Sequence, residues 1–125
     1  MGDVIPIHSR RTFTREDAER LLPVVRRITE SAAARARSLN DELSFVPREE
    51  ALHERLKGEI DLTVRRWAIK VSQLGCAPRG VWLVDFDSGN GWFSWRLGDE
   101  DLSHFHPCES AGLDMQQDGD RTPLA

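Results

Sequence analysis

Seven apolar residues in the middle of the chain recur at steps of four, four, four, three, four and three. They are Leu52, Leu56, Ile60, Val64, Trp67, Val71 and Leu74. These steps place the side chains on one face of an α-helix. Gly75 suits the left-handed residue that ends a helix, and Pro78 prevents its continuation. The spacing therefore predicts a helix over residues 48–74.

A second apolar stripe of the same kind precedes this helix. Its members are Val25, Ile28, Ala32, Ala36, Leu39 and Leu43. Thr14 and Asp17 have the spacing of a capping box, in which each side chain bonds the backbone amide of the other residue. Pro23 has no amide proton and disfavours helical geometry at Leu22. We therefore expect helix over residues 15–44, with a short helix before Pro23 and a long one after it.

The connection between the two helices is short, because Phe45-Val46-Pro47 is all that clearly interrupts the pattern. Helices joined in this way pack antiparallel, as a hairpin. Each helix has a single apolar stripe, as in a coiled coil, and the far end of the hairpin has nothing from this chain to cover it. We therefore expect a homodimer formed through the helical hairpin.

Residues 80–98 have the pattern of a β-hairpin, with two apolar runs separated by the turn-rich residues 87–91. Alternation places two sets of three side chains toward the helices, namely Trp82, Val84 and Phe86, and Phe93, Trp95 and Leu97. Asp85 and Arg96 then share the opposite face, close enough to form an ion pair. The predicted fold is α+β: a long antiparallel two-helix hairpin, preceded by a short helix, packed with a small C-terminal antiparallel β-hairpin.

The length of 125 residues indicates one domain over residues 1–125. Charge is unevenly placed, because residues 8–37 contain eight Arg and four acids, whereas residues 99–120 contain seven acids and no Lys or Arg. We expect residues 99–125 to form an acidic, partly flexible tail. Val4, Ile5 and Ile7 are expected to form a short edge strand.

Several classes of protein are disfavoured by the sequence. Two cysteines are too few for a disulfide framework, and no apolar N-terminal segment resembles a secretory signal, so we expect a cytoplasmic protein. No apolar run approaches the roughly 20 residues that cross a bilayer. A net charge of −4, with no glycine-rich phosphate loop or zinc-finger pattern, argues against nucleic-acid binding.

One short segment has the chemistry of metal ligands. It contains His104, His106, Cys108 and Glu109. In an extended segment two imidazoles and a thiolate project to one side and suit Zn²⁺ or a similar divalent metal. Pro107 disturbs that alternation, and no second ligand pair stands at zinc-finger spacing. The alternative, which we favour, is that His106 packs near the β-hairpin while His104 faces solvent.

The order of motifs resembles that of the DUF2203 family of bacterial proteins of unknown function. The matching motifs are Phe13-Thr14-x-Glu16-x-Ala18-x-x-Leu21-Leu22-Pro23, Leu83-Val84-Asp85-Phe86, Trp95-Arg96-Leu97-Gly98-Asp99-Glu100, and Phe105-His106 with Gly112 downstream. They cover nearly the whole chain. The resemblance implies a fold and a set of positions, and it leaves the mechanism open.

A second constellation comes from positions within these motifs: Asp85, Arg96, Glu100 and His106. A carboxylate that orients a histidine, beside an arginine that binds an anion, is the minimum for acid–base work on a negatively charged substrate. The same groups are the minimum for a structural salt-bridge network, which we favour. Two hypotheses therefore remain: an interaction and oligomerisation module without catalytic activity, or a metal-binding protein or metal-dependent or acid–base enzyme.

Overall fold

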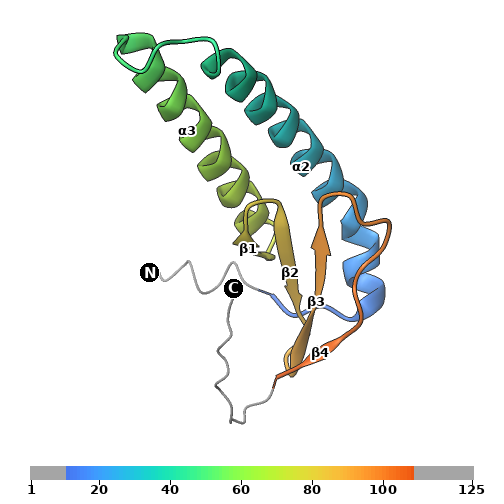
Figure 1. The fold of residues 1–125 in the computed structure, drawn as a ribbon. Coiled ribbons are helices and arrows are strands. Elements are labelled where there is room, and N and C mark those ends of the chain that lie inside the picture. The colour runs from blue at the N-terminus through green and yellow to red at the C-terminus, as the bar shows by residue number, and fades with distance from the viewer. Residues whose placement is uncertain (1–10, 109–125) are drawn as a thin grey trace, which may run out of the picture.

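The computed structural model describes residues 11–108 as two helices followed by a four-stranded antiparallel sheet. The elements are α2 (Arg15–Leu43), α3 (Ala51–Gln73), β1 (Ala77–Gly80), β2 (Leu83–Asp87), β3 (Gly91–Arg96) and β4 (His106–Pro107). The helices lie antiparallel and project well beyond the sheet, which packs at the end where α2 begins and α3 ends (Figure 1). The predicted α+β class is confirmed. The strand expected at Val4–Ile7 and the tail after residue 108 lie outside the described residues.

Helix α2 begins with the predicted capping box. The Asp17 amide donates to Thr14 Oγ1 at 3.0 Å, and the Thr14 amide donates to Asp17 Oδ2 at 3.2 Å. The hydrogen bonds from Thr14 lower the pKa of the Asp17 carboxyl. The break expected at Pro23 is wrong, because α2 runs through it without interruption, and the separate short helix is not confirmed. Leu22 and Val25 are buried on either side of the exposed proline, and this burial offsets the cost of about 3 kcal/mol for proline in a helix.

Helix α3 begins three residues later than predicted, at Ala51 rather than residue 48. Gly75 has the predicted left-handed conformation, with φ of 94°. Only part of the apolar stripe of α3 is fully covered. Three of its residues are buried, namely Leu56, Trp67 and Val71, and four are half-buried, namely Leu52, Ile60, Val64 and Leu74. The hairpin therefore leaves apolar surface along its seam.

The core lies between the helices and one face of the sheet. Val84, Phe86, Phe93 and Trp95 are buried there, as alternation predicted, together with Val25 and Val71. Trp67 donates its indole N–H to Thr29 Oγ1 of α2 at 2.8 Å, so a buried hydrogen bond ties the helices together. Trp82 precedes β2, at φ of 64°, and packs edge-on against Trp67 with ring centroids 5.0 Å apart.

The sheet has two strands more than the predicted hairpin, in the order β1-β2-β3-β4. β1 contains Pro78 and is an edge strand, where the missing amide proton costs no ladder hydrogen bond. β4 is the other edge, and the chain returns to it after the turn that follows β3. Neither strand has the alternating apolar pattern that marks a strand in a sequence.

Gly91 of β3 lies directly against Phe105 and His106. A Cβ at this position would overlap the His106 carbonyl oxygen and the Phe105 ring. Gly91→Ala is therefore expected to lower the free energy of unfolding by about 1–3 kcal/mol, as overpacking does. Gly58 of α3 is the matched control, because a Cβ there meets nothing within 4 Å. Gly58→Ala should raise stability by about 1 kcal/mol through helix propensity. Urea unfolding of both variants should show a lower free energy of unfolding for Gly91→Ala and a higher one for Gly58→Ala. Equal changes in the two variants would contradict the close approach of Phe105 and His106 to Gly91.

Candidate functional site

The outer face of the sheet, away from the helices, holds a buried carboxylate. Asp85 of β2 lies opposite Ser94 of β3 and is only 5% exposed. Its Oδ1 accepts a hydrogen bond from Ser94 Oγ at 2.7 Å, and its Oδ2 accepts one from Arg79 Nε at 2.8 Å. Both carboxylate oxygens therefore accept hydrogen bonds, and the ion pair between Arg79 of β1 and Asp85 of β2 connects the two strands.

Two serines link this carboxylate to His106. The Ser94 amide donates to Ser103 Oγ at 3.0 Å, and the Ser103 amide donates to the Ser94 carbonyl at 2.7 Å. Ser103 Oγ lies 3.3 Å from His106 Nε2, and the His106 ring stacks on Trp92 with centroids 5.6 Å apart. Asp85 and His106 thus belong to one connected polar group on the outer face.

The other predicted members of this constellation lie elsewhere. Arg96 is exposed and lies opposite Leu83, so the predicted Asp85–Arg96 ion pair is wrong. The pair fails because Asp85 and Arg96 are two positions apart in the register, and Arg79 from the unpredicted strand β1 takes the carboxylate instead. Glu100 is exposed, and its carbonyl oxygen accepts from Arg26 Nη2 at 2.6 Å.

The predicted metal ligands that the structure describes lie in or beside the edge strand β4. His104, His106 and Cys108 are all exposed, and His106 is engaged with Trp92 and Ser103. Within residues 11–108 no three His, Cys, Asp or Glu side chains are grouped so as to hold a metal ion. Glu109 lies outside the described residues. A cavity of about 210 Å³ nearby is lined by Ala77, Arg79, Asp85, Asp87, Gly89, Gly91, Trp92 and Cys108.

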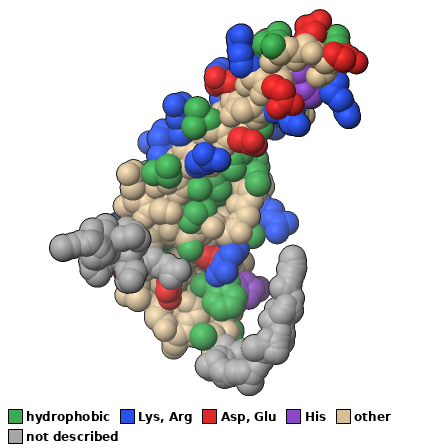
Figure 2. Space-filling model, turned by 90° about the vertical axis from the view of Figure 1, so that its left-hand side faces the viewer, with side chains coloured by type: hydrophobic (Ala, Val, Ile, Leu, Met, Phe, Trp, Pro, Cys, Tyr) green, Lys and Arg blue, Asp and Glu red, His purple; other side chains and the backbone are tan. Residues whose placement is uncertain are grey.

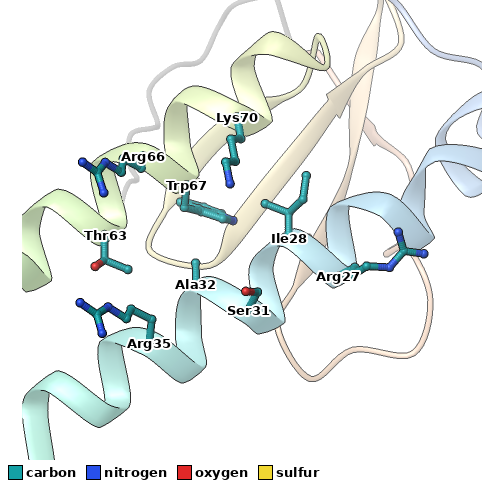
Figure 3. A pocket seen from close by; sticks show the side chains of 9 residues that line it. All are labelled: Arg27, Ile28, Ser31, Ala32, Arg35, Thr63, Arg66, Trp67 and Lys70. Carbon is teal, nitrogen blue, oxygen red and sulfur yellow. The ribbon is translucent and has the colours of Figure 1, made fainter.

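A larger hollow lies between the two helices, and we call it the basic groove. It has a volume of about 490 Å³ and is lined by Arg27, Ile28, Ser31, Ala32, Arg35, Thr63, Arg66, Trp67 and Lys70. In Figure 3 the Trp67 ring and the Lys70 side chain extend from α3 into the space between the helices. Four of the nine lining residues are cationic and none is acidic. The groove therefore has an apolar floor and four cationic lining residues, one of which, Arg35, pairs with Glu59 at 3.7 Å.

One family of proteins matches this sequence. Its sequence model, described as Uncharacterized conserved protein (DUF2203), matches residues 11–115. The chain belongs to the DUF2203 family. No curated protein and no solved structure matches the chain. The family description assigns no activity, so the chemistry of this DUF2203 protein has to be inferred from its own residues.

Three residues of the outer-face group were missed from the sequence: Arg79, Ser94 and Ser103. Arg79 stands between Pro78 and Gly80, in a segment without the pattern of a strand. Ser94 alternates with the buried Phe93 and Trp95 of β3, but a single serine in a strand gives no sequence signal of a binding role.

Of the two helices that the structure describes, neither is long and apolar enough to cross a bilayer.

Cys76 of this DUF2203 protein is predicted to be unreactive while the protein is folded. Burial raises the pKa of its thiol to about 12, against a smaller opposing effect of Arg11. In a Cys108→Ala variant, Cys76 is the single remaining thiol and should resist alkylation at mildly alkaline pH until denaturant is added. In the unfolded chain the pKa of this thiol is near its ordinary value of 9.0, whereas in the folded protein it is about 12. The free energy of unfolding should therefore also fall as the pH rises from 9.0 toward 12. Rapid alkylation of the folded variant would contradict this.

Proposed function

We propose that this DUF2203 protein is an interaction module that forms a homodimer through its helical hairpin. The observation that supports the proposal is the half-buried apolar seam of α2 and α3 beyond the sheet. Leu52, Ile60 and Val64 all lie in it. In Figure 2 hydrophobic side chains gather along the middle of the visible face, with Lys and Arg side chains around them. Two helices alone cannot enclose such a seam, and four can.

The proposal is tested by sedimentation velocity of the untagged chain over a range of micromolar concentrations. A chain of 14.2 kDa should sediment as a species of twice that mass and dissociate on dilution. Burial of the seam in the dimer should also make the thermal midpoint rise with protein concentration. A monomer at every concentration would refute the proposal.

A second proposal is an acid–base or metal-dependent site on the outer face of the sheet, with Asp85 and His106 as its central residues. The observation that favours it is the chain of contacts from the buried Asp85 through Ser94 and Ser103 to His106. It ranks second because both Asp85 oxygens are already bonded within the sheet. Metal analysis of untagged protein should find about one equivalent that is lost in His106→Ala, and sub-stoichiometric metal would eliminate the metal-dependent form.

A further inference from the structure

The tip of the helical hairpin has the opposite character to the basic groove. Phe45, between α2 and α3, is 86% exposed, the most exposed of the large hydrophobic side chains that the structure describes. Around it, residues 41–57 contain five acids and three basic residues: Asp41, Glu42, Glu49, Glu50 and Glu54, with Arg48, Arg55 and Lys57, of which Lys57 pairs with Glu54 at 3.9 Å. We call this segment the acidic tip. It presents an apolar side chain where acids outnumber basic residues, and Figure 2 shows both acidic and basic side chains at this end of the molecule.

The groove and the tip are complementary in both charge and polarity. The groove offers Ile28, Ala32 and Trp67 as its apolar floor, and Arg27, Arg35, Arg66 and Lys70 as its cations. Arg35 already pairs with Glu59 across the helices, at 3.7 Å, with both side chains more than half exposed. The Arg35 guanidinium at the rim of the groove is therefore already paired with a carboxylate of its own chain.

We propose that the basic groove of one chain receives the acidic tip of a second copy, with Phe45 on the apolar floor and the tip carboxylates beside the groove cations. This inference rests on the proposed dimer and names the surfaces that form it. The acidic tip is the occupant that the chain itself supplies, since both surfaces are on the same hairpin. Interfaces of this kind place one aromatic anchor in a pocket and surround it with charged pairs.

The geometry of the hairpin allows the contact to be made twice. Phe45 follows Ser31 of the groove by 14 residues, so tip and groove are about 20 Å apart along the helix axis. Two antiparallel hairpins that overlap by this length place each tip at the groove of the other. The arrangement is closed and two-fold, and it stops at a dimer.

The test uses exposed residues, so that folding of the monomer is not at risk. Phe45→Ser, the tip reversal Glu49→Lys with Glu50→Lys, and the groove reversal Arg66→Glu with Lys70→Glu should each weaken dimerisation at least about tenfold in sedimentation equilibrium. The single change Arg66→Glu is measured as well, with Arg65→Glu as its matched control, because Arg65→Glu makes the same change one position outside the groove and should alter dimerisation by less than about threefold. Combining the two reversals in one chain should restore most of the affinity. Circular dichroism confirms that each variant is folded.

The outcomes separate this inference from the proposed function. A dimer that is weakened by both reversals and restored by their combination supports the tip in the groove. A wild-type dimer that none of the three changes weakens would overturn the inference and leave the hairpin dimer standing. Weakening by the groove reversal alone would overturn the acidic tip as the occupant, and a wild-type monomer would overturn both proposals.

Discussion

Trp95→Ala is expected to lower the free energy of unfolding by about 3–5 kcal/mol, the largest effect of any single truncation in the sheet. Trp95 is 1% exposed, faces the helices from β3, and donates its indole N–H to the Asp99 carbonyl at 2.9 Å. Its loss would leave a cavity in the core and an unpaired carbonyl at the turn after β3. Urea unfolding should show a lower midpoint at an unchanged m-value.

Trp92→Ala is the matched control, because it removes the same side chain from the same strand on the opposite face. Trp92 is half-buried and stacks on His106, so its loss should cost about 0.5–1.5 kcal/mol. If Trp92→Ala were as damaging as Trp95→Ala, the assignment of the inner and outer faces of β3 would be wrong.

Arg79→Met is expected to cost about 2–3 kcal/mol, because it leaves the buried Asp85 carboxylate without its cation. The value is below the roughly 3–5 kcal/mol found for breaking fully buried pairs, since the Arg79 side chain is 61% exposed. Adding Asp85→Asn removes the uncompensated charge. The double variant should therefore be more stable than Arg79→Met alone, by denaturant unfolding.

The control for this pair is Arg20→Met, which breaks an ion pair with Asp17 that is exposed on both sides and lies outside the basic groove. Its expected cost is about 0–1 kcal/mol. A double variant no more stable than Arg79→Met would mean that Asp85 is not held as a buried charge, and the polar group on the outer face would then have no electrostatic role.

Local pattern was sufficient to predict the parts of this fold that neighbouring residues decide. The capping box at Thr14, the left-handed Gly75 and the inner face of β2 and β3 were all predicted from residues within a few positions of one another. Pro23 was judged by the same local rule and the prediction was wrong, because the burial of Leu22 and Val25 outweighs the proline penalty. A local conformational preference does not decide the structure where tertiary packing contributes more free energy.

The candidate site shows the same division. Asp85 and His106 were both singled out from the sequence by residue type, and the structure connects them through Ser94 and Ser103. Arg96 was assigned to Asp85 by face alone, whereas the partner is set by register, which places Leu83 opposite Arg96. Arg79 could not be selected, because β1 has no strand pattern and exists through its pairing with β2.

The sequence by itself determined the two helices, their apolar stripes and the buried face of the central strands, because helical and strand periodicity depend on short-range spacing. The order of its motifs indicated the family. Only the tertiary structure decided the edge strands, the partner of Asp85 and the basic groove between α2 and α3. These depend on which distant residues meet, and register and helix packing settle that through contacts between segments many positions apart.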